Sequence, residues 1–460
     1  MIHLHLQDLL EKIKGKVVEG PVNPQLTNAT VLPNKLKSHG VLFNTHNYKT
    51  IDCSHLKNGA AWVIITEKKP EIIGNHSGVT LVIVQKIRKS YWKFIEYYQS
   101  LFDIPIIGVT GTCGKSTTKD MIRHILKQKY KNVVSTYKSR NGLTMNLPYL
   151  TKIDEKTDAA VIEMGIAHPN DLLVTCRYFR PQIGIITTIG VDHLDQFKNQ
   201  DHYIQEKGTF LKGLGNQGTL IINGDNENIK KIDMSQYQGD IITFGQEDSC
   251  HYKASKITYG NGGMEFILHT KGMTVPVYVP GYGEHNVYNA MAALAAVALI
   301  GFDIKKSAKA LASFEHIERH IQFYKGMKGC TLIDDTWSSN PTSLEAALKV
   351  VKKFSQDKKN IVVMGRIALL GNATAKIYTQ VGRMLNKYGV DTLITIGNRA
   401  KAIGDAAMKH GMDKKSVFVC RDATEVYNLL QTMIDENTVV LLKNSMIDSA
   451  SKGLAEKLRF

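Results

Sequence analysis

The sequence is poor in the features that mark secreted, zinc-binding and membrane proteins. Its 460 residues include six cysteines, and none belongs to a Cys-x-x-Cys pair. This scatter offers neither zinc-ligand spacing nor a disulfide framework, so we expect reduced thiols. The longest apolar run, Met291 to Ile300, is about half as long as a membrane span. The first ten residues carry polar and acidic side chains where a signal peptide needs an apolar core. These absences predict a soluble, cytoplasmic protein with no membrane span.

The chain also lacks any lysine- and arginine-rich run interleaved with aromatic residues. Its net charge of +16 arises from 58 Lys and Arg against 42 Asp and Glu, with the cations spread through the whole chain. A solvated basic surface explains this better than a nucleic-acid-binding stripe, so no nucleic-acid partner is expected. An anionic substrate that bears phosphate would also fit.

The length suggests about three domains, since single cores stop growing well below this size. Alternating strand and helix patterns predict an α/β fold: a small N-terminal α/β domain over 1–103, a central P-loop ATPase domain with a mainly parallel sheet over 104–318, and a C-terminal Rossmann-like domain over 319–460. The central strands are expected at 104–109, 159–163, 183–188 and 218–222, with a helix over 286–300. The C-terminal strands are expected at 330–334, 361–364, 392–396, 416–419 and 438–442.

Residues 108–118 read Gly-Val-Thr-Gly-Thr-Cys-Gly-Lys-Ser-Thr-Thr, follow an apolar strand and lead into a helical pattern. Glycines allow backbone N–H groups to turn toward a phosphate, and the helix N-terminus and Lys115 add positive charge. Val109 stands where the strict phosphate-loop spacing has glycine, so this is not the common nucleotide-hydrolase version. The predicted nucleotide-binding residues of the loop are Gly111, Thr112, Cys113, Gly114, Lys115, Ser116 and Thr117, with Ser116 placed to hold Mg²⁺.

Polar residues follow two other strands of the predicted central sheet. Glu163 ends the strand 159–163, and His193 lies in Val191-Asp-His-Leu-Asp195 after the strand 183–188. Taken singly, these would most often be a solvated carboxylate and a loop histidine. Beside a phosphate loop they become candidate metal ligands, because Mg²⁺ on ATP phosphates needs carboxylate oxygen. Lys207 follows His193 by fourteen residues and would ordinarily be a surface lysine.

In this context the chain resembles the Mur ligase family. The motifs Gly-x-Thr-Gly-Thr-x-Gly-Lys-Ser/Thr, Glu-Met-Gly, and Asp-His-Leu-Asp followed by Tyr-x-x-x-Lys stand here in order at 108–116, 163–165 and 192–207. Residues 283–289 are similar to the family's adenine-contacting helix start, with Asn286 and Asn289. Residues 334–341 are similar to a segment of the member that adds a dipeptide, which is the closest resemblance.

The resemblance implies an ADP-forming carboxylate–amine ligase that uses ATP and Mg²⁺. A small-molecule carboxylate would take the γ-phosphate of ATP, and an amino acid or dipeptide would attack the acyl phosphate to form an amide. Catalysis would fall to Lys115, Glu163, His193, Lys207 and Arg319. ATP would also meet Asn286, Asn289, Arg319 and Asp335, and metal would be held by Ser116, Glu163, His193 and Lys207.

In the family, the lysine aligned with Lys207 carries a carbamate. A lysine ammonium about 4 Å from a divalent ion would suffer roughly 8 kcal/mol of repulsion at an effective dielectric of 20. A carbamate reverses the sign of this interaction, so Lys207 is either modified or not next to metal.

The two ends of the chain depart from the family pattern. The first domain lacks the Ser-Arg pair that would meet a UDP-muramoyl group. Arg366 stands where the family has Asp, and Met446 where it has Arg. The carboxylate therefore remains open between a UDP-muramoyl peptide of cell-wall precursor synthesis and the substrate of a divergent paralogue. Two other functional classes remain as alternatives. One is a P-loop NTPase or phosphotransferase, and the other is a nucleotide-binding regulatory protein. We expect a monomer.

Overall fold

The computed structural model describes residues 1–56, 61–74 and 78–459, and this chain divides into two compact units. The first unit comprises residues 1–108, 129–165 and 171–182, and the second comprises 109–128, 166–170 and 183–460. Within the described ranges, no helix is both long and apolar enough to cross a membrane. The predicted α/β class with mainly parallel sheets is confirmed.

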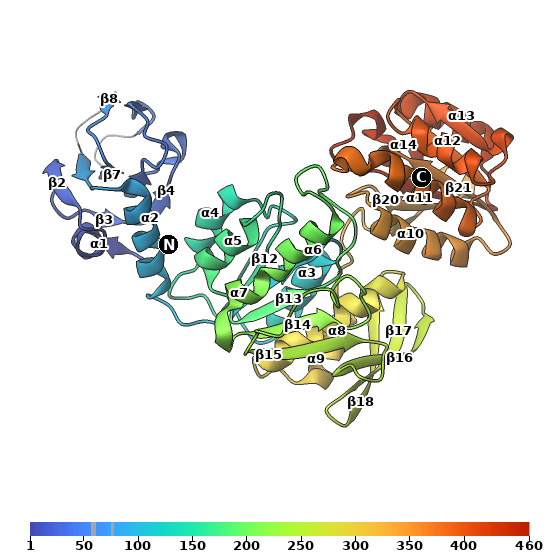
Figure 1. Ribbon diagram of the computed structural model, residues 1–460, viewed down its shortest axis with the longest axis horizontal. Helices are drawn as coiled ribbons and strands as arrows, with labels where there is room; N and C mark the ends of the chain where they lie inside the picture. The colour runs from blue at the N-terminus through green and yellow to red at the C-terminus, as the bar shows by residue number, and fades with distance from the viewer. Residues whose placement is uncertain (57–60, 75–77, 460) are drawn as a thin grey trace. The chain divides into compact units, whose positions relative to one another are not determined.

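The N-terminal part of the first unit is built on a five-stranded sheet, seen in blue in Figure 1. Its order is β2-β9-β7-β5-β4, parallel except for β2. The side chain of Phe43 leaves the sheet and stacks on Phe94 of helix α2, with ring centroids 4.7 Å apart. The elements are β1 (Leu4–His5), α1 (Leu6–Ile13), β2 (Lys16–Glu19), β3 (Gln25–Leu26), β4 (Asn28–Thr30), β5 (Gly40–Phe43), β6 (Thr50–Asp52), β7 (Trp62–Thr66), β8 (Glu71–Ile73), β9 (Val79–Ile83) and α2 (Ile87–Gln99).

The rest of the first unit holds strands β11, β12 and β10, which are neighbours in that order. Strand β10 crosses the boundary between the units, which falls between Gly108 and Val109. Its burial, complete along all five residues, explains the continuous apolar sequence. The elements are β10 (Ile106–Thr110), β11 (Val133–Ser135), α4 (Asn146–Leu150), β12 (Ala159–Glu163) and α5 (Asp171–Phe179).

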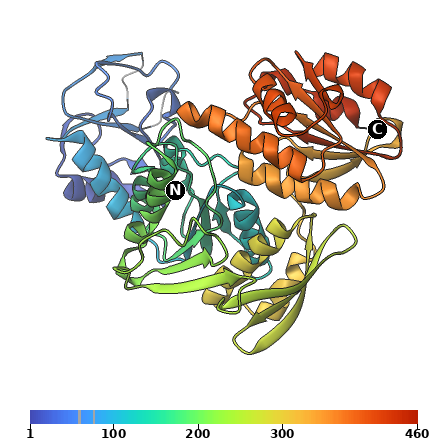
Figure 2. The same cartoon turned by 45° about the vertical axis from the view of Figure 1, so that its right-hand side comes forward.

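The second unit continues with strands β13 to β18 in consecutive order, around the helix α8. Helix α8 is buried along most of its length, and its alanines allow close packing on helix α3. Strands β16, β17 and β18 pair antiparallel and flank α8, as Figure 2 shows in yellow and yellow-green. The elements are α3 (Lys115–Leu126), β13 (Ile183–Ile186), α6 (Gln200–Gly208), α7 (Phe210–Leu214), β14 (Thr219–Asn223), β15 (Asp240–Gly245), β16 (Tyr252–Tyr259), β17 (Gly263–Thr270), β18 (Met273–Pro280), α8 (Glu284–Leu299) and α9 (Ile304–Leu311).

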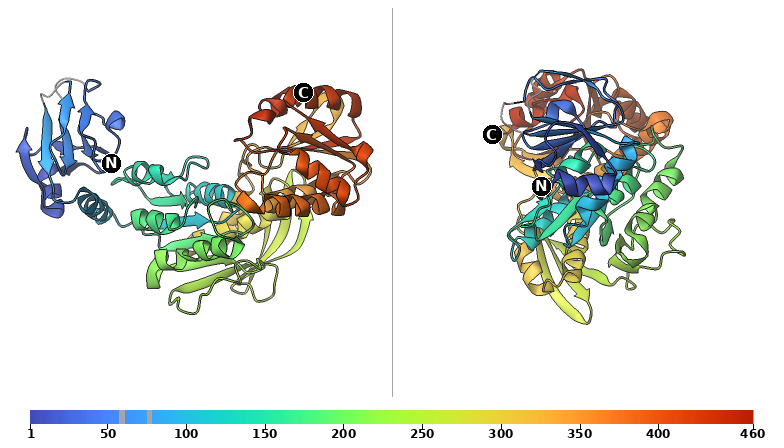
Figure 3. Two further views of the ribbon diagram at one scale, coloured as in Figure 1. Left: turned by 45° about the horizontal axis from the view of Figure 1, so that its top comes forward. Right: turned by 90° about the vertical axis from the view of Figure 1, so that its left-hand side faces the viewer.

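The C-terminal part of the second unit has a six-stranded sheet of order β19-β20-β24-β21-β22-β23, parallel except for β19. Helices α10, α11 and α12 pack on one face, and α13 and α14 on the other. Figure 3 shows this layered arrangement in orange and red. The elements are β19 (Gln322–Lys325), β20 (Thr331–Asp335), α10 (Pro341–Phe354), β21 (Lys359–Met364), α11 (Thr374–Lys387), β22 (Thr392–Ile396), α12 (Lys401–Lys409), β23 (Val417–Cys420), α13 (Ala423–Met433), β24 (Thr438–Lys443) and α14 (Leu454–Leu458).

Candidate functional site

The phosphate loop connects the end of β10 to the start of α3. Gly111 and Gly114 have φ values of 145° and 85°, which L side chains rarely adopt. A Cβ atom at Gly111 would also collide with the hydroxyl of Thr187, and one at Gly114 with the side-chain oxygen of Asn289. Glycine is therefore required at both positions, for conformation and for space.

The loop is fixed in place by hydrogen bonds to residues that lie outside the motif. The N–H of Thr112 donates to the carbonyl of Thr188 at 2.6 Å, and the Thr187 hydroxyl donates to the Cys113 carbonyl at 2.5 Å. The Thr112 hydroxyl accepts from the Gly190 N–H and lies 3.0 Å from the Tyr203 hydroxyl. These bonds hold the loop backbone in one conformation, as a preorganised anion site requires.

The start of α3 has the properties of an anion-binding helix terminus. Gly114 is its N-cap residue and supplies no side-chain capping bond, and the first turn contains no acidic residue. Its N–H groups thus lack a capping side chain and carry the positive end of the helix dipole. Lys115 begins the helix, and its Nζ donates to the Thr112 carbonyl at 3.0 Å. Ser116 and Thr117 follow in the first turn. The residues fit a bound phosphate.

Lys207 belongs to helix α6, and its side chain contacts the phosphate loop. Its side chain is only 1% exposed, and its Nζ donates to the Thr110 hydroxyl at 3.2 Å and to the Gly111 carbonyl at 3.0 Å. The Tyr203 ring is 5.5 Å from the same nitrogen. Lys207 is therefore no surface lysine: its amino group is buried against the phosphate loop.

His193 has a left-handed backbone, with φ of 53°, and a backbone N–H that donates to the carboxylate of Asp192. Burial lowers the pKa of His193; Lys115 and Lys207 lower it further, and Asp192 opposes them. The neutral imidazole that results is the form that binds metal. His193, Lys115 and Lys207 thus share one electrostatic environment.

Glu163 lies in the first unit, at the carboxyl end of β12, and is 2% exposed. Its Oε1 accepts from the Asn141 side chain at 2.7 Å, and its N–H donates to the Thr136 hydroxyl. In the described ranges, no three His, Cys, Asp or Glu side chains converge as a metal site would require. The predicted metal set depends instead on Ser116 and Lys207 as well as Glu163 and His193.

Two buried asparagines of α8 carry unpaired polar atoms. Asn286 and Asn289 are 1% and 5% exposed, and the Asn286 Oδ1 and the Asn289 Nδ2 have no hydrogen-bond partner. The Thr118 hydroxyl of α3 donates to the Asn289 Oδ1 at 3.3 Å, which ties α8 to the helix of the phosphate loop. A free acceptor and a free donor suit an adenine edge, which offers both.

Asp335 and Arg319, the two remaining residues predicted to contact ATP, form ion pairs within the C-terminal part. Asp335, at the end of β20, accepts from Lys443 Nζ at 2.7 Å, and Lys443 is completely buried. The guanidinium of Arg319 donates to Glu456 of α14 at 2.8 Å and is 40% exposed. Lys443 was not among the predicted site residues, although a lysine that ends the apolar strand β24 is visible in the sequence.

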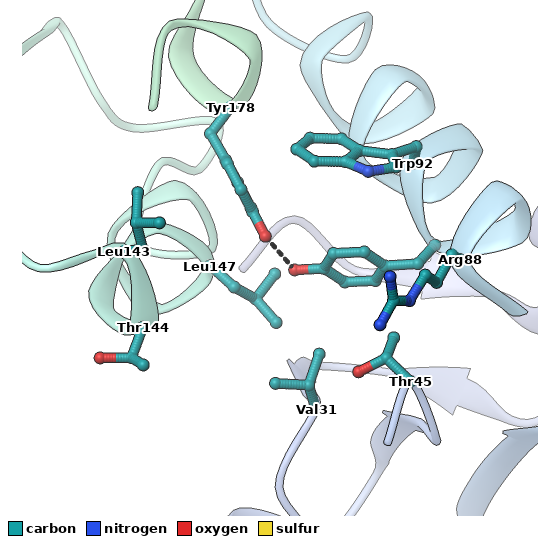
Figure 4. A pocket seen from close by; sticks show the side chains of 9 residues that line it. Val31, Thr45, Arg88, Trp92, Leu143, Thr144, Leu147 and Tyr178 are labelled. Carbon is teal, nitrogen blue, oxygen red and sulfur yellow. Dashed lines mark hydrogen bonds between the residues drawn. The ribbon is translucent and has the colours of Figure 1, made fainter. Parts of the chain in front are cut away.

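The first unit contains a separate cavity of about 290 Å³. Figure 4 shows the aromatic rings and the guanidinium group around it. Tyr91 and Tyr178 join across it through their hydroxyls at 2.7 Å, and burial raises the pKa of both. Arg88 is its one charged residue. The lining residues, which sequence reasoning missed because they come from distant segments, are Val31, Thr45, Arg88, Tyr91, Trp92, Leu143, Thr144, Leu147 and Tyr178.

Comparison with known protein families identifies the class. Residues 109–297 match the Mur ligase middle domain, and residues 319–446 match the Mur ligase, glutamate ligase domain. The chain belongs to the Mur ligase family of ADP-forming ligases, which use ATP. The resemblance inferred from the motifs is confirmed.

Two relatives that align with this chain over nearly its full length have the same name. The UDP-N-acetylmuramoyl-tripeptide–D-alanyl-D-alanine ligase of Bacillus subtilis is 25% identical, with 97% of this chain and 96% of the relative covered. The protein of the same name from Haemophilus influenzae is also 25% identical, with coverages of 98% and 96%. The predicted closeness to the dipeptide-adding member is thereby confirmed.

Solved structures agree on the fold. MurF from Acinetobacter baumannii superposes with a TM-score of 0.81 at 23% identity, covering 98% of both chains. MurF from Thermotoga maritima in complex with ADP gives a TM-score of 0.74 at 19% identity, covering 94% of this chain and 97% of that one.

Proposed function

We propose that this protein joins D-alanyl-D-alanine to the carboxylate of a UDP-N-acetylmuramoyl tripeptide, with ATP converted to ADP and phosphate. The observation that carries the proposal is the full-length similarity to two relatives of that name, together with a phosphate loop in which Gly111 and Gly114 have positive φ values. Both proposed substrates of the first step are anionic, which suits a chain of net charge +16. We further propose a cytoplasmic monomer with domains at 1–103, 104–318 and 319–460.

In the proposed reaction, an oxygen of the substrate carboxylate attacks the γ-phosphorus of ATP, and ADP leaves. The amine of the dipeptide then attacks the acyl carbon and loses a proton, and phosphate leaves with the carboxylate oxygen. Lys115 and the N–H groups at the start of α3 offset the charge that accumulates between carboxylate and triphosphate. Asn286 and Asn289 orient the adenine, while Asp335 and Arg319 are the proposed contacts to the ribose and γ-phosphate. Bound Mg²⁺, held by Ser116, Glu163, His193 and Lys207, would supply further positive charge.

The experiment that tests this function measures ADP release with UDP-muramoyl tripeptide and D-alanyl-D-alanine, each added alone and both together. We expect rapid ADP release only with both, and a product whose mass equals the two substrates less one water. Release of ADP without the amine, or with no condensed product, would instead support an NTPase.

Replacing Lys207 with alanine should lower kcat roughly tenfold to a hundredfold, the loss typical when a group supporting a metal site is removed. If Lys207 carries a carbamate, millimolar acetate or formate should restore part of the rate by supplying the missing carboxylate. The measurement is ADP release with and without these acids. A wild-type rate in the Lys207→Ala variant would exclude a metal-binding role.

The cavity of Figure 4 is the proposed site of the uridine diphosphate group. Arg88 is exposed and makes no ion pair within the described ranges, whereas the Trp92 ring is already covered by the guanidinium of Arg177, 4.0 Å from the ring centroid. Arg88→Ala should therefore raise the KM for the UDP-linked substrate about tenfold, since a charge-assisted hydrogen bond is worth roughly 1.5–3 kcal/mol. The adjacent Lys89→Ala variant is the control, because Lys89 is exposed but does not line the cavity. Equal KM values for both variants would remove the cavity from the substrate site.

A further inference from the structure

The side chain of Arg319 is held by a carboxylate of this chain. Its guanidinium donates to Glu456 of helix α14 at 2.8 Å, and the two side chains are 40% and 49% exposed. The proposed reaction gives Arg319 a different anion to bind, the γ-phosphate of ATP. Both contacts use the same planar fork of N–H groups, so they compete for it.

The backbone of Arg319 is fixed, so a change of partner is confined to the side chain. The N–H donates to the Gln322 side chain at 3.2 Å, and the carbonyl accepts from the Trp337 N–H at 3.3 Å. Arg319 and Ile321 both have left-handed backbones, with φ values of 62° and 54°. Such conformations are costly for residues other than glycine and persist only where the surroundings impose them. The guanidinium, by contrast, ends a long and partly exposed side chain.

Glu456 belongs to a helix that is firmly anchored. Three of the five residues of α14 are buried. Arg459, which follows the helix, donates to the carboxylate of Asp334 at 2.6 Å, and its guanidinium lies 3.8 Å from the centre of the Tyr324 ring. Glu456 is therefore a fixed partner, and the side chain of Arg319 is the one that can move.

The helix that holds Arg319 and the helix that the phosphate loop contacts lie on opposite faces of one sheet. Helix α10 packs on one face of the six-stranded sheet, and α14 packs on the other. The phosphate loop meets the start of α10, where the Cys113 thiol donates to the Asn340 side chain at 3.4 Å. Arg319 is thus paired with the helix on the face opposite to the one at which the phosphate loop makes this contact.

The two anions differ in their strength as partners for arginine. An exposed pair with a single carboxylate contributes little, because water solvates both charges well. A terminal phosphate offers three oxygens and more negative charge, and its geometry matches the arginine fork. ATP can therefore displace Glu456 from Arg319, whereas ADP has no phosphate group at the γ position.

We propose that Glu456 is a positioning residue that holds Arg319 until the γ-phosphate of ATP takes its place. The proposal rests on the proposed function, because that function assigns Arg319 to the γ-phosphate. Breaking the ion pair opposes the binding of ATP alone, so Glu456 weakens the affinity for ATP and leaves the affinity for ADP unchanged. Helix α14 thereby sets how strongly this chain distinguishes ATP from ADP.

The test measures, by calorimetry on the full chain with Mg²⁺, the dissociation constants of ADP and of an ATP analogue whose γ-phosphate cannot be transferred. Glu456→Gln should bind the analogue about two- to fivefold more tightly than the wild type, as expected for the loss of one exposed ion pair. Its affinity for ADP should not change. Arg319→Gln should bind the analogue roughly tenfold to a hundredfold more weakly, as for a lost charge-assisted hydrogen bond. Adding Glu456→Gln to Arg319→Gln should have no further effect.

The control is Glu425→Gln, which removes the carboxylate from another arginine pair in the C-terminal part, that with Arg421. It should match the wild type with both nucleotides. Unchanged or weaker binding of the analogue in Glu456→Gln, an equal gain for ADP, or the same gain in the Arg319→Gln background would overturn the proposal. The binding test needs neither the UDP-linked substrate nor the dipeptide. Absence of the condensed product in the ADP-release assay would therefore contradict the proposed function alone.

Discussion

Lys115→Ala is expected to lower kcat roughly a hundredfold to a thousandfold, the loss observed when one preorganised donor to a developing negative charge is removed. The Lys115 amino group lies beside the loop carbonyl of Thr112, at the start of a helix whose first turn has no acidic residue. The measurement is ADP release at saturating substrates.

The matched control is Lys127→Ala, because Lys127 is exposed at the other end of the same helix. Its rate should equal that of the wild type, and both variants should have the same melting temperature. If Lys115→Ala retained more than half of the activity, the loop would not be the site of phosphoryl transfer.

Lys443→Met is expected to destabilise the C-terminal part by about 3–5 kcal/mol, because it leaves the carboxylate of Asp335 buried without its cation. Asp335 is 6% exposed, and Lys443 is completely buried. For a domain of this size, such a loss corresponds to a fall in melting temperature of roughly 10 °C. Thermal unfolding followed by circular dichroism provides the measurement.

Two variants separate the ion pair from other effects of the substitution. Lys401→Met breaks an exposed pair with Asp405 and should change stability by less than about 1 kcal/mol. The double variant Lys443→Met with Asp335→Leu removes both buried charges and should recover much of the lost stability. A single Lys443→Met variant as stable as the wild type would show that the pair contributes nothing to folding.

Local patterns were sufficient to predict most of the fold. The strands β12 and β22 have the bounds expected from the sequence, and helix α3 begins at Lys115 as predicted. The antiparallel strands β16 to β18 were missed, although β17 and β18 alternate between buried and more exposed residues. Only in β16 is the pattern interrupted, at the register shift between Ser255 and Thr258. The phosphate loop was found because its geometry depends on residues adjacent in sequence.

The contacts that define the sites join distant residues, and sequence patterns do not show them. Asp335 and Lys443 are 108 positions apart, and Tyr91 and Tyr178 are 87 apart. The burial of Lys207 was not predictable either, since lysines are almost never fully buried unless paired. Only the motif around it distinguished Lys207 from a surface residue.

The most direct test of the central claim follows a labelled oxygen atom. The UDP-muramoyl tripeptide is prepared with ¹⁸O at both oxygens of its reacting carboxylate and incubated with ATP, D-alanyl-D-alanine and the protein. Because the carboxylate attacks the γ-phosphorus and its oxygen leaves with the phosphate, we predict that one ¹⁸O atom appears in each inorganic phosphate released. Unlabelled phosphate, formed together with ADP, would contradict a ligase that acts through an acyl phosphate.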